Sequence, residues 1–135
     1  MTQQPLKVAV IGAGPAGIYA SDLLIRNEEH DIHVDLFEQM PAPFGLIRYG
    51  VAPDHPRIKG IVKSLHNVLD KDKLRLIANV TVGRDITIDD LRDYYDAVVL
   101  STGAVRDREL LIPGGDKSIG AGEFVGFYDG NPRFE

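Results

Sequence analysis

Apolar residues at the start of the chain predict a strand, a helix and a second strand. Residues 7–11 form a continuous apolar run, which is typical of a strand buried on both faces of a parallel sheet. A helix is predicted from Pro15 to Arg26, because proline suits the first helical turn. Residues 33–38 predict the second strand, so that one βαβ unit spans 32 residues. The inner face of the helix is expected to carry Ala16, Ala20, Leu23 and Leu24.

The next segment, residues 39–56, contains half of the eight prolines together with interleaved apolar residues. This mixture predicts an ordered loop, and long ordered loops in compact domains are usually functional. A helix is predicted after Pro56, because the apolar residues that follow recur on one helical face. These residues are Ile58, Ile61, Val62, Leu65, Val68 and Leu69.

The second half of the chain alternates between further strand-like and helical segments. Residues 74–82 are β-like, and residues 87–95 predict a short helix with Thr87 as its N-cap and Asp90 completing a capping box. Residues 97–100 predict another buried strand, and residues 111–135 are glycine-rich and expected to be irregular. The pattern as a whole predicts one α/β domain, residues 1–135, with a mostly parallel sheet.

A glycine fingerprint, Gly12-x-Gly14-x-x-Gly17, lies between the first strand and the helix. Gly12 permits a tight turn, Gly14 lets a pyrophosphate approach the backbone, and Gly17 lets the helix pack on the strands. The helix N-terminus offers N–H groups to phosphates. Glu38 ends the second strand, where its carboxylate can accept both hydroxyls of an adenosine ribose. The fingerprint therefore predicts a Rossmann-like dinucleotide site, and Glu38 disfavours NADP there and leaves FAD or NAD.

Composition and charge exclude several other classes of protein. The net charge of −5 argues against nucleic acid as a partner. Apolar runs stay well short of the roughly 20 residues that span a bilayer, which predicts no membrane insertion. The sequence has no cysteine and no signal-peptide pattern, which favours the cytoplasm. The four histidines lack metal-ligand spacing, so no metal site is expected.

One segment of this acidic chain, residues 48–63, is locally basic. It carries Arg48, Arg57, Lys59 and Lys63 against a single acid, Asp54. This segment is either a solvated loop and helix face or a surface that meets phosphates or an acidic partner protein.

Two further motifs favour FAD and indicate a family. The apolar strand ending in Ser101-Thr102-Gly103 resembles that of two-dinucleotide flavoproteins, whose first fingerprint holds FAD. Residues 43–56, Pro-Phe-Gly-Leu-Ile-Arg-Tyr-Gly-Val-Ala-Pro-Asp-His-Pro, resemble the signature of the adrenodoxin reductase type of ferredoxin–NADP reductase. The resemblance extends over residues 79–85, 101–104, 112–114 and 124–128. Glutamate synthase small subunits share the Gly-Leu-x-Arg-Tyr-Gly part but lack the Ala-Pro-Asp-His-Pro that follows here.

The resemblance assigns site residues by position. It implies that FAD contacts Gly12, Gly14, Ala16, Gly17, Glu38, Gly45, Leu46 and Val82, the last at the adenine. His55 would lie near the flavin ring as the candidate catalytic residue, although it could instead cap or position the helix that starts at Pro56. Arg108 would approach the phosphates of the nicotinamide nucleotide, with Arg106 as a near neighbour that could take the same role.

The resemblance also implies an activity, namely electron transfer between NADPH and a ferredoxin-type iron–sulfur protein through FAD. Family members are several hundred residues long and carry an NADP-binding domain and a C-terminal FAD segment, which are expected to be absent here. The chain is therefore expected to be the N-terminal FAD-binding portion, incomplete relative to the family. By itself it is expected to bind FAD weakly and not to turn over NADPH. The alternatives are a non-catalytic dinucleotide-binding module and a flavin subunit of the glutamate synthase type.

Overall fold

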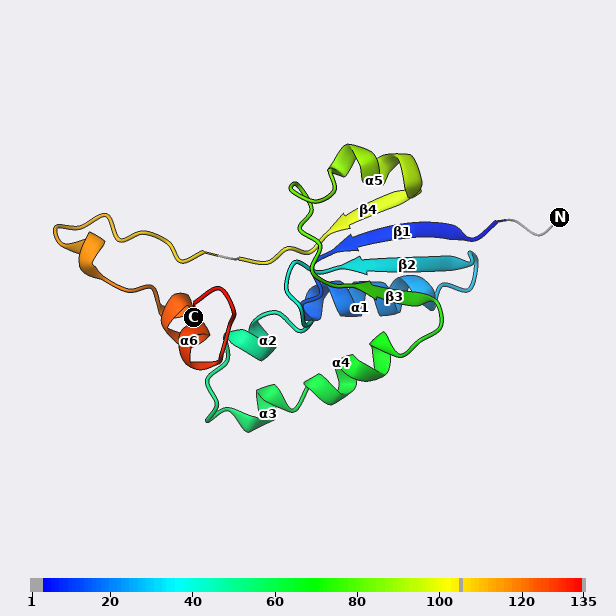
Figure 1. Cartoon of the computed structure of the whole chain (residues 1–135). Helices are drawn as coiled ribbons and strands as arrows, with labels where there is room; N and C mark the ends of the chain where they lie inside the picture. Colours follow the sequence, from blue (N-terminus) through cyan, green and yellow to red (C-terminus); the bar gives the residue numbers. More distant parts are fainter. Residues whose placement is uncertain (1–3, 105, 135) are drawn as a thin grey trace.

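A four-stranded parallel sheet flanked by helices forms the body of the molecule (Figure 1). The computed structural model describes residues 4–104 and 106–134. The strands are β1 (Leu6–Ile11), β2 (Ile32–Phe37), β3 (Leu74–Ile77) and β4 (Ala97–Leu100), in the order β3-β2-β1-β4. Every neighbouring pair is parallel, so the predicted parallel α/β fold is confirmed.

Apolar side chains cover both faces of the sheet, as the apolar run at residues 8–11 of β1 predicts. Val8 and Val10 belong to a core that includes residues of α1 (Pro15–Ile25) and α4 (Val62–Leu69). Ala9 and Ile11 belong to a second core, which is completed by α5 (Ile88–Tyr94). The two cores therefore lie on opposite sides of the sheet, because neighbouring residues in a strand face opposite ways.

The helix α1 has the predicted bounds to within one residue, but only part of its predicted inner face is confirmed: Leu24 packs against the core and Ala20 is half-buried. The structure buries Gly17, Ile18, Ser21 and Ile25. Leu23 is 71% exposed, and Ala16 is exposed as well. The helix itself carries apolar residues on several of its sides, so the spacing of these residues alone does not identify the buried face. The close contact at Gly17, described below, sets that face instead.

The helix predicted after Pro56 is divided in two. The structure has α3 (Pro56–Lys59) and α4, with Gly60 and Ile61 between them. Ile61 and Lys63 donate their N–H groups to residues three positions earlier, so the chain tightens locally at these points. Glycine is the weakest ordinary helix former, which accounts for a break at Gly60.

Three other segments differ from the predictions. The β-like run from residue 74 ends at Ile77, because Asn79 adopts a positive φ of 59° that a strand does not allow. The strand β4 forms an edge of the sheet, and Leu100 there is 67% exposed. The tail predicted to be irregular contains a short 3₁₀ helix, η1 (Gly115–Lys117), and α6 (Ala121–Tyr128). Its last residue, Glu135, lies outside the described residues.

The capping box predicted at the start of α5 is confirmed. The Thr87 Oγ1 accepts the N–H of Asp90 at 3.1 Å, and the Asp90 carboxylate accepts the N–H of Thr87 at 2.9 Å. Two orphan donors of the helix end are thereby satisfied. Within residues 4–104 and 106–134, none of the helices has both the length and the apolar content needed to cross a membrane.

A polar cluster on the sheet links β2, β3 and the end of α5. The Arg75 guanidinium contacts the Asp35 carboxylate at 2.6 and 2.8 Å, and Tyr95 donates its hydroxyl to Asp35 at 2.6 Å. Burial alone would raise the pKa of Asp35, but these hydrogen bonds hold it below its ordinary value. Burial, together with the bond to Asp35, raises the pKa of Tyr95 to about 12.

This cluster makes stability fall at high pH. The pKa of Tyr95 in the folded state exceeds its ordinary value of 10.0, so its stabilisation is complete below pH 10 and is lost as the pH rises through about 12. We expect the difference in unfolding free energy between wild type and Tyr95→Phe to stay constant at neutral pH and to shrink across that window. Urea titrations at each pH measure it, with Tyr94→Phe at an exposed position as the matched control. A difference that does not change with pH would contradict the prediction.

Candidate dinucleotide-binding site

The turn between β1 and α1 has its carbonyl groups bonded to the protein. Those of Gly12, Ala13 and Gly14 accept, in that order, from Ser101 Oγ at 3.0 Å, Phe44 N–H at 2.8 Å and Ile18 N–H at 3.0 Å. The first N–H groups of α1 have no partner within the helix by geometry. The end of the turn therefore presents donors and the positive end of a helix dipole, an arrangement suited to phosphate.

The three fingerprint glycines are required for different reasons. Gly12 has a φ of +105°, and a Cβ there would overlap the carbonyl oxygen of Ser101. A Cβ on Gly17 would overlap the carbonyl oxygen of Gly12 and lie 2.7 Å from Ser101 Oγ. Gly14 has an ordinary φ of −75°, and no atom of the described residues lies within 4 Å of its Cβ position. Internal packing thus explains Gly12 and Gly17, whereas Gly14 borders open space.

The carboxylate of Glu38 lies at the end of β2 and is only 6% exposed. Its Oε2 accepts the N–H of Ala13 at 2.9 Å, and its Oε1 accepts the N–H of Met40 at 2.9 Å. Each carboxylate oxygen has a second acceptor site, so Glu38 can still accept the hydroxyls of a ribose. The same side chain therefore holds the fingerprint turn and remains able to bind a ligand.

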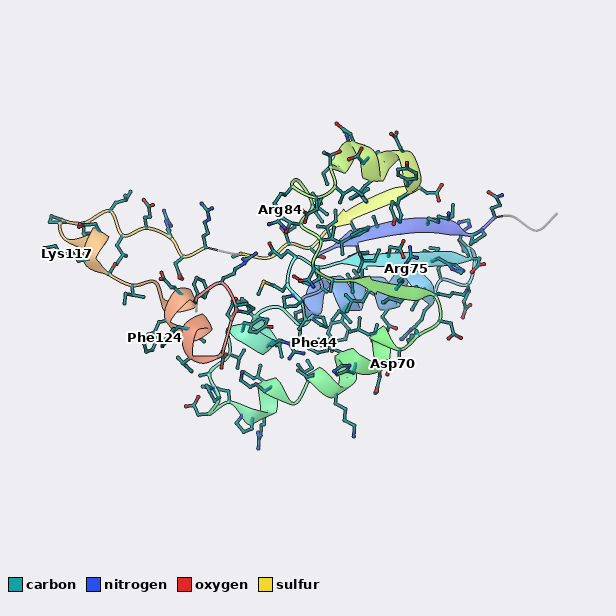
Figure 2. All side chains as sticks on the ribbon, viewed as in Figure 1. Phe44, Asp70, Arg75, Arg84, Lys117 and Phe124 are labelled. Atoms are coloured by element: carbon teal, nitrogen blue, oxygen red, sulfur yellow. The ribbon has the colours of Figure 1, made fainter. Side chains whose placement is uncertain are left out.

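The loop that follows β2 reaches the fingerprint turn through Phe44, which lies beside α2 (Leu46–Tyr49) (Figure 2). Phe44 is fully buried, and its φ of +89° is unusual for a residue with a side chain. Its N–H bond to Ala13 brings Gly45 close to Gly14, where a Cβ on Gly45 would lie 3.2 Å from the Gly14 Cα. Gly45 and the exposed Leu46 therefore lie near the open space at Gly14.

Arg48 of the same loop is held in place by its neighbours. Its Nε donates to the carbonyl of Pro43 at 3.0 Å, and its guanidinium lies 5.1 Å from the centre of the Phe44 ring. Lys59 donates to the Arg48 carbonyl at 3.3 Å and pairs with Asp129 at 3.2 Å. Two of the four basic side chains of this segment are therefore held inside the protein, and the charge of one of them, Lys59, is balanced by a carboxylate.

His55 precedes α3, and its side chain is 58% exposed. Its Nδ1 lies 2.9 Å from Asp54 Oδ1, and the side chain makes no capping bond to α3. The backbone carbonyl of His55, in contrast, accepts the N–H groups of Ile58 and Lys59. The ring of His55 is thus not used as a helix cap and remains accessible.

The structure does not bring all predicted site residues to the turn. Val82 is half-buried against the second core and forms an isolated bridge with Ile86. Arg106 and Arg108 are exposed in the extended segment between β4 and η1 (Figure 1). The ligand contacts of Val82, His55 and Arg108 stay predictions. In residues 4–104 and 106–134, His, Asp and Glu side chains form no group of three that could hold a metal ion.

A groove of about 380 Å³ lies along α5 and β4, away from the fingerprint turn. It runs beside the exposed edge of the sheet and contains no fingerprint residue. Its lining residues are Ile88, Arg92, Tyr95, Asp96, Ala97, Val98 and Leu100. Without the helix N-terminus, the glycines and Glu38, this groove lacks the features that recognise a dinucleotide, so we place the site at the turn.

Fold and turn together define a Rossmann-like dinucleotide-binding domain. A family model described as an NAD(P)-binding Rossmann-like domain matches residues 10–73. Among curated proteins, the probable mitochondrial NADPH:adrenodoxin oxidoreductase of Schizosaccharomyces pombe is 43% identical over 134 residues, covering 98% of this chain and 28% of that protein. The NADPH-ferredoxin reductase FprA of Mycobacterium tuberculosis is 41% identical over 138 residues, covering 98% and 30%.

The solved structures that are similar to this chain include those of the same ferredoxin reductase, FprA. The structure of Mycobacterium tuberculosis FprA in complex with NADPH has a TM-score of 0.92 and 41% identity over 97% of this chain and 30% of that chain. A variant of FprA with one histidine replaced by glutamine has a TM-score of 0.92 and 40% identity. Over nearly its whole length, the chain is thus similar to reductases of the adrenodoxin and ferredoxin type. It spans less than a third of the length of these relatives.

Proposed function

We propose that the chain binds FAD and serves as the FAD-binding part of an oxidoreductase that transfers electrons between NADPH and a ferredoxin-type iron–sulfur protein. The observation that carries the proposal is the open space at Gly14, which the N-terminus of α1 borders and Gly45 approaches. The names of the relatives support the proposed electron transfer, because these names pair NADPH with adrenodoxin or ferredoxin.

The described residues fit the adenosine diphosphate half of FAD. A pyrophosphate placed at Gly14 would meet the free N–H groups at the start of α1, near Ala16 and Gly17. The buried carboxylate of Glu38 would accept ribose hydroxyls through its remaining acceptor sites. Because Gly14 has no Cβ, the phosphates can approach the backbone there more closely than they could with any other residue type at that position.

The remaining assignments concern the flavin end of the cofactor. Gly45 and Leu46 would line the cofactor along the loop, and Val82 would meet the adenine through its backbone. His55, whose ring is accessible, would contact the flavin or its redox partner. When bound, FAD supplies the chemistry by accepting two electrons as hydride from NADPH and passing them singly to an iron–sulfur centre. We assign NADPH binding mainly to parts of the enzyme beyond these residues, with Arg108 approaching its phosphates.

The partner and compartment are part of the same proposal. Arg57 and Lys63 are exposed on the basic segment, and charge pairing with an acidic iron–sulfur protein would speed its encounter. We propose the cytoplasm as the compartment, on the basis of the sequence features given above. Several relatives carry mitochondrial names, so microscopy of the tagged protein in its own cells is the direct measurement.

FAD binding tests the proposal directly. Titrating the purified chain with FAD is expected to perturb the visible flavin bands, with NADP⁺ unable to compete because of the carboxylate at Glu38. A Glu38→Ala variant should bind FAD at least about tenfold more weakly, since a charge-assisted hydrogen bond contributes about 1.5–3 kcal/mol and each 1.4 kcal/mol is about tenfold. NADPH oxidation by the chain alone is expected to stay at background.

The matched control is Glu28→Ala, which removes an exposed carboxylate outside the site. This variant is expected to bind FAD as the wild type does. Unchanged flavin bands at high micromolar wild-type protein would refute the proposed function. Equal binding by Glu38→Ala and wild type would refute only the ribose assignment.

A further inference from the structure

Ser101 follows β4 and joins the edge of the sheet to the fingerprint turn. Its N–H donates to the Ile11 carbonyl at 2.8 Å, and its Oγ lies 2.9 Å from that oxygen and 3.0 Å from the Gly12 carbonyl oxygen. The Ile11 carbonyl thus already has a donor in the Ser101 backbone. Among the described residues, the Gly12 carbonyl receives no other hydrogen bond. The hydroxyl hydrogen is therefore needed chiefly at Gly12.

The peptide group between Gly12 and Ala13 is held at both ends. Its carbonyl accepts from Ser101 Oγ, and its N–H donates to Glu38 Oε2 at 2.9 Å. Since a peptide group is planar, fixing both ends fixes its rotation about the chain. The next peptide group, between Ala13 and Gly14, has its carbonyl bonded to Phe44. Its Gly14 N–H points the opposite way, away from Phe44.

Packing around Ser101 leaves this arrangement little freedom. The Ser101 carbonyl fills the space that a Cβ on Gly12 would need, and Ser101 Oγ lies 2.7 Å from the Cβ position of Gly17. The Ser101 hydroxyl is therefore the side-chain group that lies where the end of β4, the turn and the start of α1 meet. A small residue with a hydroxyl donor fits the available space and supplies the hydrogen bond to the Gly12 carbonyl.

We propose that Ser101 is a positioning residue for the pyrophosphate of the bound dinucleotide. By holding the Gly12 carbonyl, it fixes the peptide group between Gly12 and Ala13 and thereby orients the next one, whose Gly14 N–H would face the phosphates, without touching the ligand itself. The inference rests on the proposed function, because it concerns the same site. The inference adds that binding of the phosphate part of the ligand, rather than binding of the adenosine part, depends on Ser101.

Two ligands that differ only in phosphate separate these parts. We expect Ser101→Ala to weaken binding of ADP to the full chain by about five- to tenfold, the value of one backbone hydrogen bond to the phosphates that is lost when the turn is no longer held. Binding of adenosine should change less than about twofold, since Glu38 and the ribose contacts remain. Calorimetry measures both affinities, and circular dichroism confirms that the variant is folded. Ser118→Ala, which removes an equivalent exposed hydroxyl-to-carbonyl bond, should leave both unchanged.

Loss of folding alone would not produce this selectivity, because it reduces the binding of both ligands in proportion. If Ser101→Ala is unfolded, Ser101→Cys fills nearly the same space with a weak donor and should show the selective loss of ADP. Equal weakening of ADP and adenosine, or wild-type affinity for ADP in a folded variant, would overturn the inference. A wild-type chain that binds neither FAD nor ADP would overturn the proposed function and this inference together.

Discussion

Replacing Gly17 with alanine is expected to destabilise the domain by more than about 3 kcal/mol or to prevent folding, since the substitution overpacks a rigid contact. The new Cβ would overlap the Gly12 carbonyl oxygen and approach Ser101 Oγ to 2.7 Å. The Gly12 oxygen belongs to the backbone, and the Ser101 hydroxyl is held by its hydrogen bond to the Gly12 carbonyl. Neither atom can therefore move aside easily. Urea denaturation followed by circular dichroism measures the loss.

The same substitution at Gly14 is the matched control, and its expected effect is the reverse. The φ of −75° suits any residue, and no described atom lies within 4 Å of the new Cβ, so stability should change by less than about 0.5 kcal/mol. Binding of FAD should fall at least about tenfold, because the methyl group occupies the path of the pyrophosphate. A stable Gly17→Ala variant would contradict the packing argument. Unimpaired binding by Gly14→Ala would contradict the placement of the phosphates.

The elements that sequence reasoning predicted well are those with a local cause. The strand β1 contains an apolar run at residues 8–11, Pro15 starts α1, and Thr87 with Asp90 starts α5. These features act over a few residues, so their outcome can be deduced from the residues alone. The predicted buried face of α1 is wrong at Ala16 and Leu23, because the buried face is set by contacts with distant parts of the chain. The edge position of β4 likewise depends on strand order, which local pattern does not contain.

The residues of the candidate site fall into the same two groups, namely those predicted by local sequence and those that depend on distant contacts. The fingerprint and Glu38 were found because their spacing follows from the geometry of one βαβ unit. The bond from Ser101 to Gly12 joins residues 89 positions apart, so no spacing along the chain predicts it. The Ser101-Thr102-Gly103 motif did mark the position, but only as the end of a strand. Phe44 stands in the sequence only as one of the interleaved apolar residues of the loop, although its positive φ and full burial make it the anchor of that loop.

Replacing Phe44 with alanine should therefore cost about 3–5 kcal/mol of stability, the usual range for a fully buried phenylalanine. The ring is 0% exposed, belongs to the core between the sheet and α4, and lies edge-on to His66 at 4.8 Å. Alanine removes these contacts but keeps the strain of a positive φ, so nothing offsets the loss. The loop that carries Gly45 should loosen, and FAD binding should weaken under conditions where the variant is still folded.

Two further variants separate the ring of Phe44 from its backbone. Phe44→Leu keeps most of the apolar volume and should cost less than about 1.5–2 kcal/mol, with FAD binding largely retained. Phe127→Ala removes a ring that is 65% exposed on α6 and should change stability by less than about 1 kcal/mol. Thermal unfolding and FAD titration of all three variants measure these differences. Because the N–H of Phe44 still reaches Ala13 in each variant, equal FAD affinity for folded Phe44→Ala and wild type would show that this backbone bond alone positions the loop.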